Sequence, residues 1–170
     1  SHPLAGTEYS GPNSGFSSLF ENRYWLIVHD KQTNETKKLI NFFQKLGSIV
    51  EIVNTEYHDK ILAITSHLPH LIAYTIVGTA SDLETDLKND VIKFSASGFR
   101  DFTRIASSDP IMWRDVFLNN SDAVLEMLQR FNEDLSDLQK AIRKKDGDKL
   151  HSFFSRTRLI RKKIIDAGQI

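Results

Sequence analysis

The first third of the chain alternates short apolar runs with one helical pattern. Residues 23–29 (RYWLIVH) and 48–53 (SIVEIV) are rich in β-branched and aromatic residues and have the length of strands. Between them, 33–46 has helical spacing, and Gly47 stands where a C-terminal cap belongs. The apolar face of this helix consists of Leu39, Ile40, Phe42, Phe43 and Leu46. The pattern predicts one βαβ unit, and because its strand edges need partners we expect the end of a larger α/β domain.

From residue 55 onward only helical spacing remains. Pro69 is expected to kink the first helix or to break its hydrogen bonding. Asp109 and Pro110 have the residue types of an N-cap and a first helical position, and Gly147 suits a left-handed cap. The predicted helices cover 55–80, 86–94, 99–106, a segment from 110, 121–145 and 148–167. The last two are too long for a small domain to bury in its own core, so we expect a homodimer.

Composition excludes several classes of function. Lys plus Arg and Asp plus Glu both number 22 among 170 residues, so no global field favours nucleic acid or anionic lipid. The chain has no cysteine, which excludes disulfides and thiolate chemistry and favours the cytoplasm. No run approaches the roughly 18 apolar residues that a membrane span needs, so no membrane partner is expected.

The opening stretch SHPLAGTEYSGPNSGF is rich in Gly, Ser and Pro and is typical of a loop, with a helical turn expected at 16–20. Two interpretations of His2 remain open. It is an exposed group near a chain end, or it is a general base in a rigid loop that also presents Thr7 and Glu8.

Two further segments hold polar groups on apolar helices. His67 and His70 in HLPH could share a helix face, but Pro69 distorts that turn and a metal site needs a third ligand, so we expect no metal. The alternative is a hydrogen-bonded core or pocket histidine. In the second segment, 95–113, small residues precede Arg104, which binds a substrate carboxylate or forms an internal salt bridge.

Four blocks of sequence carry a family resemblance. They are HPLAGTE at 2–8, SGPNSGFSSLFENR at 10–23, ITSHLPHLIAY at 64–74 and SGFRDFTRIASSDPIMWRDVF at 97–117. Together they resemble the prephenate dehydrogenase family, most of all its cyclohexadienyl (arogenate/prephenate) variant. The resemblance implies a mainly α chain, in which 1–54 is the βαβ end of a Rossmann-type domain and 55–170 is a helical substrate-binding and dimerisation domain. The family's GxGxxG fingerprint is absent, so the chain resembles a C-terminal fragment.

The resemblance also implies an activity. Enzymes of this family oxidise and decarboxylate prephenate or arogenate in tyrosine biosynthesis and pass a hydride to NAD or NADP. His2 matches the histidine that accepts a hydrogen bond from the ring hydroxyl, and Arg104 matches the arginine that binds a substrate carboxylate. His70 matches a residue that recognises the side chain of the substrate or of tyrosine.

Other matched positions have supporting roles. Ser97, Gly98 and Trp113 match pocket positions, and Thr7 and Glu8 are expected to shape or regulate the pocket. Asp59 and Arg100 resemble a gate in which the acid reaches the site from the partner subunit.

These matches leave a small set of expectations for the chain as a whole. The cofactor is held mainly by the missing domain, tyrosine is an inhibitor, and the fragment is inactive alone. We also expect the His2 loop to be poorly ordered or displaced. The alternative is a free-standing helical dimer that senses tyrosine or a dicarboxylate, and a helical dimer without any ligand is a third hypothesis.

Overall fold

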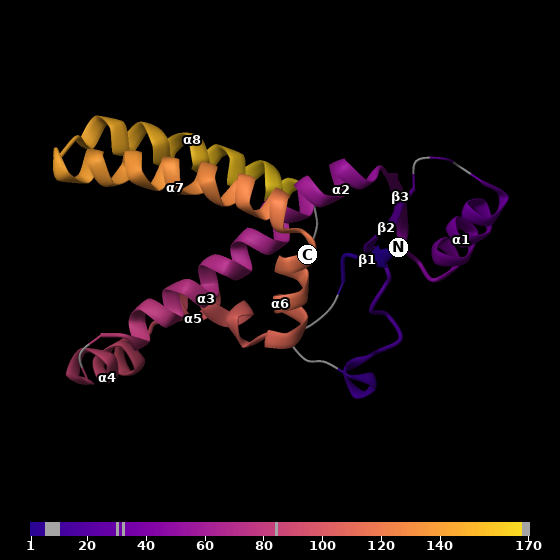
Figure 1. Ribbon diagram of the computed structural model, residues 1–170, viewed down its shortest axis with the longest axis horizontal. Helices are drawn as coiled ribbons and strands as arrows, with labels where there is room; N and C mark the ends of the chain where they lie inside the picture. Colours follow the sequence, from indigo (N-terminus) through magenta and orange to yellow (C-terminus); the bar gives the residue numbers. More distant parts are fainter. Residues whose placement is uncertain (6–10, 30, 32, 84, 168–170) are drawn as a thin grey trace. The chain divides into compact units, whose positions relative to one another are not determined.

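The computed structural model describes residues 1–5, 11–29, 31, 33–83 and 85–167, and within this range the side chains of 85–88 and 92 are not described. The chain forms two compact units, Ser1–Met127 and Leu128–Ile170. Figure 1 traces the order of the elements, with the strands and one α-helix in the N-terminal part and the other α-helices after them.

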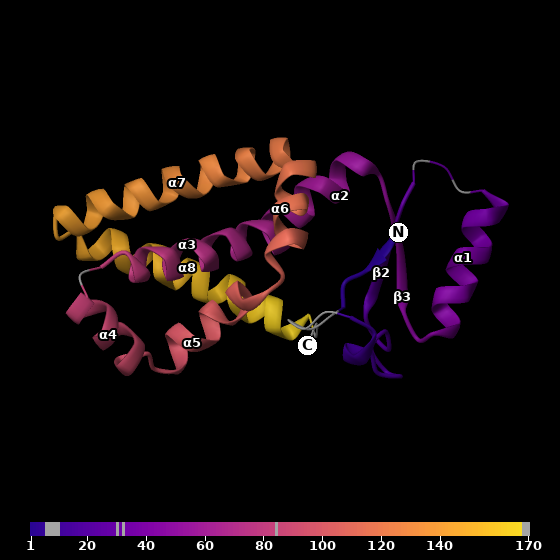
Figure 2. The ribbon, with the colours of Figure 1, turned by 60° about the horizontal axis from the view of Figure 1, so that its bottom comes forward.

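Unit 1 begins with a small mixed sheet in the order β1-β2-β3. The three strands are β1 (His2–Pro3), β2 (Tyr24–Val28) and β3 (Ile49–Val53). β2 and β3 are parallel and are joined by helix α1 (Asn34–Lys45), which makes the predicted βαβ unit. α1 lies to one side of the two long strands (Figure 2), where Phe43 stacks on Trp25 at a ring distance of 3.8 Å.

The N-terminal loop differs from expectation. His2 and Pro3 form β1, which pairs antiparallel with Leu26 and Trp25 of β2, and Leu4 N donates to Tyr24 O at 2.7 Å. The prediction that the His2 segment is displaced is therefore wrong at His2, because backbone hydrogen bonds to β2 hold it. The expected helical turn at 16–20 is a series of turns, and a 3-10 helix, η1 (Pro12–Ser14), comes earlier.

The apolar face of α1 is only partly covered. Phe43 is buried, whereas Phe42 is 56% exposed. Leu39 and Leu46 are also exposed, at 44% and 40%. The described strands offer contact to one side of the helix only, so the broad face predicted from the sequence is half open to solvent.

Gly47 ends α1 with a φ of 83°, a left-handed conformation that side chains rarely adopt. A Cβ added there would lie 3.1 Å from Cγ of Glu21. We therefore expect Gly47→Ala to lower the free energy of unfolding by about 1–2 kcal/mol in urea titrations. The matched control is Gly78→Ala inside helix α3, where an added Cβ meets open space and stability should rise by about 0.5–1 kcal/mol. Equal effects of the two substitutions would contradict this account.

β3 runs directly into the helical part of unit 1. Asn54 follows the strand and accepts a hydrogen bond from Tyr57 N at 2.8 Å through its side chain, which caps helix α2. A continuous rod follows, with its path visible in Figure 1, made of α2 (Thr55–Leu62), a π-helical turn η2 (Ala63–His67) and α3 (Leu68–Ser81). The predicted helix over 55–80 is confirmed, and the irregularity lies where Pro69 was expected to cause one, because proline cannot donate its backbone hydrogen bond.

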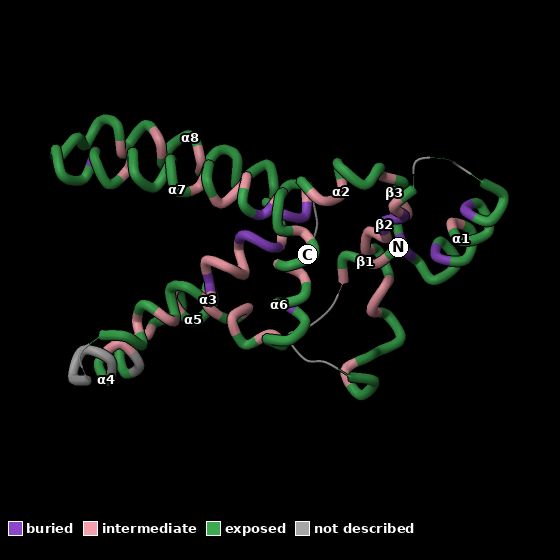
Figure 3. Tube along the Cα trace, in the orientation of Figure 1, coloured by how far each residue is buried: buried purple, intermediate pink, exposed green. Residues whose placement is uncertain are grey.

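This rod is long and apolar enough, by length and composition, to cross a membrane. The prediction that no apolar run approaches the length of a membrane span is wrong for this continuous helix. Its apolar residues are interrupted by Thr, Ser, His and Gly, which add no charge, so the helix as a whole stays apolar. Several of its residues are buried within unit 1, where Figure 3 shows the buried class around η2: Leu62, Ala63, His67, Leu68 and Ala73. We interpret it as the core helix of unit 1.

The remaining helices of unit 1 are short and match the predicted order: α4 (Thr85–Phe94), α5 (Ser97–Thr103), η3 (Arg104–Ser107) and α6 (Pro110–Asn119). Asp109 caps α6 by accepting hydrogen bonds from Ile111 N and Met112 N, as predicted. The hydroxyl of Tyr74 on α3 donates to Ser108 O at 2.7 Å, which ties η3 to the core helix.

Helix α7 (Ser121–Arg143) extends from unit 1 into unit 2, which it shares with α8 (Gly147–Asp166). The residue with a left-handed backbone at their junction is Lys145, with φ 53°, and Asp146 N donates to Ala141 O at 2.9 Å. The prediction that Gly147 takes this role is wrong, because the helix ends two residues earlier and Gly147 begins α8. The fold class is confirmed: a mainly helical chain follows a βαβ unit.

Candidate functional site

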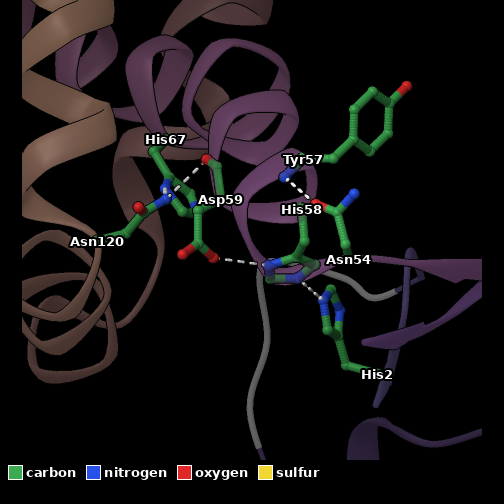
Figure 4. A network of polar contacts seen from close by, with 7 residues as sticks. All are labelled: His2, Asn54, Tyr57, His58, Asp59, His67 and Asn120. Carbon is green, nitrogen blue, oxygen red and sulfur yellow. Dashed lines mark hydrogen bonds and ion pairs between the residues drawn. The ribbon is translucent and has the colours of Figure 1, made fainter. Parts of the chain in front are cut away.

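Two histidines from distant parts of the sequence meet where the sheet joins the helices. His2 on β1 and His58 on α2 have their Nε2 atoms 2.8 Å apart (Figure 4). Their rings meet edge to face, with centroids 5.2 Å apart. The other nitrogen of His58, Nδ1, lies 2.8 Å from the carboxylate of Asp59, and His2 Nδ1 lies 3.1 Å from Pro3 O. The carboxylate of Asp59, the imidazole of His58 and the imidazole of His2 therefore form a continuous series, called the chain of contacts.

Burial sets the protonation of His2. The half-buried position of the ring lowers the pKa of His2 below its ordinary value of 6.5, and the charges of His58 and of the Ser1 amino group act in the same direction. The hydrogen bond to Pro3 O opposes this by raising the pKa, but it is the smaller cause. His2 is therefore neutral at pH 7 and is suited to accept a proton.

Asn120 connects this chain of contacts to His67. The side-chain amide of Asn120, just after α6, donates to Asp59 O at 2.9 Å and lies 3.2 Å from His67 Nδ1 (Figure 4). Because Asn120 bonds the backbone of Asp59, it fixes the first turns of α2 relative to the end of α6. Burial is the main cause that lowers the pKa of His67, and nearby His58 and His70 lower it further.

A second cluster gathers around Trp113. The ring of His70 stacks on Trp113 at 3.6 Å, and His70 Nδ1 lies 2.8 Å from Ser66 O, so this nitrogen donates and Nε2 is the acceptor of the neutral ring. Burial is the main cause that lowers the pKa of His70, and the charge of Arg104 lowers it as well. Arg104, at the start of η3, thus lies close enough to His70 for its charge to lower the pKa of the imidazole.

The structure places the other predicted residues less closely together. Ser97 and Gly98 begin α5 and are exposed, and a Cβ on Gly98 would meet open space. Arg100 is also exposed on α5. Thr7 and Glu8 lie outside the described residues. The Asp59 side chain, 42% exposed, pairs with His58 of its own chain, and its predicted role in a partner's site stays a prediction.

Neither a metal cluster nor a hollow on the described surface brings the predicted site residues together. Within the described residues, no group of three His, Cys, Asp or Glu side chains could hold a metal ion. An open, mostly apolar hollow lies along α2, and it includes none of the predicted site residues. Its lining is Asn54, Glu56, Tyr57, Lys60, Ile61, Ile64 and Met127. The polar clusters, rather than this hollow, are the candidate site.

The lowered pKa values predict how the stability of the chain depends on pH. His2, His67 and His70 resist protonation when folded, so the unfolded chain binds more protons as pH falls below 6.5. Their contribution is fully present above that pH and is lost as pH falls through the window just below it. We expect the free energy of unfolding in urea to fall between about pH 7 and pH 5, and less steeply in His70→Gln. An unchanged slope in that variant would contradict the assignment for His70.

Sequence reasoning assigned no role to two members of the site. The pair His58-Asp59 is recognisable in the sequence as a polar place, but nothing in a single sequence indicates that His58 meets His2 across 56 positions. Asn120 was read only as the start of the long helix, because an Asn at a helix boundary is typical of a cap. Predicting the contact of His58 with His2 requires β1, whose two residues carry no strand pattern.

Comparisons with known protein families define the class of protein to which this chain belongs. Residues 1–52 match the family model described as prephenate dehydrogenase, nucleotide-binding domain, and residues 54–156 match the one described as prephenate dehydrogenase, dimerization domain. The chain thus matches a nucleotide-binding domain over its first 52 residues and a dimerization domain from residue 54 onward. It belongs to the prephenate dehydrogenase family, as the sequence blocks indicated.

Individual relatives agree with this membership. The chain is 39% identical over 163 residues to cyclohexadienyl dehydrogenase from Zymomonas mobilis, covering 95% of this chain and 56% of the relative. It is 32% identical to prephenate dehydrogenase from Bacillus subtilis, covering 90% of this chain and 42% of that protein. The crystal structure of prephenate dehydrogenase from Aquifex aeolicus with hydroxyphenyl propionate and NAD+ has a TM-score of 0.86 and 34% identity, covering 96% of this chain and 57% of that one. The chain spans about half the length of the curated relatives it matches.

Proposed function

We propose that this chain is the C-terminal part of a prephenate or arogenate dehydrogenase, carrying the proton acceptor, the substrate site and the dimer contacts. The whole enzyme oxidises and decarboxylates the cyclohexadienol ring, with hydride passing to NAD or NADP and the ring carboxylate leaving as carbon dioxide. The observation that carries the proposal is the position of His2. This ring, matched to the family's proton acceptor, contacts His58 on α2, and burial lowers its pKa.

His2 accepts the proton of the ring hydroxyl. As the hydroxyl carbon becomes a carbonyl carbon, the oxygen must release its proton, and a neutral imidazole is a suitable base. The half-burial that lowers the pKa of His2 keeps the ring unprotonated at pH 7. The two backbone-paired residues of β1 fix the ring's place, and a fixed base loses less orientational freedom on reaching the transition state.

The Trp113 cluster binds the rest of the substrate. Arg104 supplies a planar cation for a substrate carboxylate, and stacking on Trp113 orients the His70 ring beside it. The neutral His70 ring keeps Nε2 as an acceptor for an amino group or as a partner for water. Recognition of tyrosine as an inhibitor would use the same His70. Ser97 and Gly98 leave room for close approach of ligand to backbone at the start of α5.

The described sheet does not fit a dinucleotide's pyrophosphate. The junction of β2 and α1, where a Rossmann-type unit would present its glycine-rich turn, reads HDKQT and contains no glycine. We therefore assign no residue of this chain to the nicotinamide cofactor. The bound NAD+ of the Aquifex aeolicus structure supports the use of this cofactor by the whole enzyme. The domains we propose are 1–54 and 55–170, and the family models meet between 52 and 54.

The partner is a second copy of the chain, joined through the helical domain. In unit 2, most of α7 and α8 belongs to the exposed class (Figure 3). The large apolar residues among these exposed positions are Leu135, Ile142, Phe154, Leu159, Ile160, Ile164 and Ile165. Exposed apolar surface of this extent is typical of a protein–protein contact. We expect sedimentation equilibrium to give about twice the 19.4 kDa of one chain at micromolar concentration, and Leu159→Asp to weaken that dimer. A monomer over the whole concentration range would contradict this part of the proposal.

Activity is tested in an assembled dehydrogenase. We define it as this chain joined to the part of Zymomonas mobilis cyclohexadienyl dehydrogenase that the chain does not match. With prephenate or arogenate and oxidised cofactor, the assembled dehydrogenase should form reduced nicotinamide, measured by its absorbance, whereas the chain alone should form none. A folded assembled dehydrogenase that binds NAD+ and forms no reduced cofactor with either substrate would contradict the proposal and favour a sensing module.

A further inference from the structure

We propose that the apolar hollow along α2 is a dimer contact: a second copy of this chain covers it and thereby fixes the helix that carries His58 and Asp59. The apolar lining of the hollow comes from the helical rod and from Met127 of α7. The inference rests on the proposed function, because it names the part of unit 1 that the proposed dimer covers and connects the dimer to the candidate site.

The hollow side of α2 carries apolar side chains that remain accessible. Tyr57, Ile61 and Ile64 are four and three residues apart, so they lie along one side of the rod and line the hollow together. Tyr57 is 56% exposed and Ile64 is 45% exposed, whereas Leu62 of the same helix is buried. A continuous exposed patch with an aromatic ring and branched aliphatic side chains is typical of a protein–protein contact.

The other side of the same helix holds part of the candidate site. Figure 4 shows the Tyr57 ring pointing away from the chain of contacts, which runs from Asp59 through His58 to His2. Contacts with His2 and with Asn120 hold this side of α2, a helix of eight residues. A partner seated in the hollow would hold the remaining side, and would stabilise the position of His58 without touching His2.

Three observations favour a second copy as the occupant. The family model described as a dimerization domain covers 54–156, which includes the residues that line the hollow. Met127 belongs to α7, the helix that also carries exposed apolar side chains of the proposed dimer contact. The rim has one acid and one base, Glu56 and Lys60, whose side chains pair at 3.0 Å. A rim of balanced charge can face its own copy without like-charge repulsion, as a two-fold contact requires.

Other occupants fit the hollow less well. A polar small molecule would need several converging donors and acceptors, but the hollow is mostly apolar and the Asn54 side chain is engaged in capping α2. An acidic protein or a nucleic acid would need a basic surface, but Lys60 is paired with Glu56 at the rim. The chemistry of the surface therefore suits an apolar protein surface of balanced charge.

The test uses the absence of cysteine from the chain, because a single introduced cysteine is then its one thiol. We expect maleimide labelling of Ile64→Cys to slow about tenfold when the chain is raised to about one hundred times the dimer Kd, since mass action then leaves few monomers. Leu39→Cys on α1 is the matched control, because Leu39 is 44% exposed and lies outside the dimerization-domain match. Its labelling rate should not depend on concentration. Sedimentation equilibrium of both variants gives the dimer Kd.

Each other result of the labelling experiment would overturn the inference. Ile64→Cys that is labelled at the same rate in monomer and dimer would show that the dimer forms elsewhere, with the proposed function intact. Slow labelling at every concentration would show that the chain covers its own hollow. A chain that stays monomeric would remove the occupant, and sedimentation distinguishes this failure of the proposed dimer from a dimer that leaves the hollow open.

The link from the hollow to His58 is tested in the assembled dehydrogenase. Dilution below the dimer Kd should lower kcat, because α2 loses the support of the partner. An excess of this chain, which should form no reduced cofactor by itself, should restore kcat by covering the hollow of the diluted enzyme. A kcat that is the same in monomer and dimer would contradict the claim that the partner fixes α2.

Discussion

Replacing His2 by Asn in the assembled dehydrogenase should lower kcat by about 10²- to 10⁴-fold, the usual contribution of a positioned general base. Asn keeps a polar side chain on β1 but cannot take a proton at neutral pH. The loss should fall on kcat more than on KM, because the proton is transferred in the chemical step rather than on binding. Initial rates of cofactor reduction over a range of substrate concentrations measure both constants.

The matched control for His2 is His29→Asn, at an exposed position just after β2. Its side chain is not part of the Asp59, His58 and His2 chain of contacts, so its kcat should stay within twofold of the unmutated enzyme, about the error of such comparisons. Equal losses in the two variants would show a general effect on the sheet. A His2→Asn enzyme with full activity would remove His2 from the mechanism.

Replacing Arg104 by Ala should weaken substrate binding by about 2–4 kcal/mol, or roughly 30- to 1,000-fold in Kd, the range for charge-assisted hydrogen bonds to one carboxylate. Arg104→Lys keeps the positive charge but loses the planar guanidinium. Its Kd should therefore lie between those of the unmutated enzyme and of Arg104→Ala. Calorimetric titration of the assembled dehydrogenase with hydroxyphenyl propionate, the ligand of the Aquifex aeolicus structure, measures the change directly.

Arg114→Ala is the matched control for Arg104. Arg114 is an exposed arginine of α6 that pairs with the neighbouring Asp115 at 2.8 Å, and exposed pairs of this kind contribute little. Its removal subtracts the same charge without touching the Trp113 cluster. If both arginine variants weaken binding equally, the effect is one of net charge, and Arg104 is not the carboxylate anchor.

The helices were predictable because local signals specify them. Pro69 marks the irregular turn in the 55–81 rod, and Asp109 followed by Pro110 marks the start of α6, and both signals act within one helical turn. The cap after α7 was misassigned for the same reason, since glycine is the usual left-handed residue and Lys145 takes the strained conformation instead.

The long-range part of the site was not predictable. His2 was expected in a displaced loop, and its pairing with Leu26 depends on a strand of two residues that has no periodicity to detect. The open side of α1 shows the same limit, because apolar spacing predicts a face but not what covers it. The residues of the Trp113 cluster were indicated by family blocks, while the contact of His2 with His58 came only from the structure.

The most direct test of the central claim is the ratio of carbon dioxide released to nicotinamide reduced by the assembled dehydrogenase. An oxidative decarboxylation releases one molecule of each per turnover, so we predict equal amounts with prephenate or arogenate, and His2→Asn should lower both together. Reduced cofactor without carbon dioxide, or neither product from a folded, dimeric and NAD+-binding enzyme, would contradict the claim that this chain carries the substrate site of such a dehydrogenase.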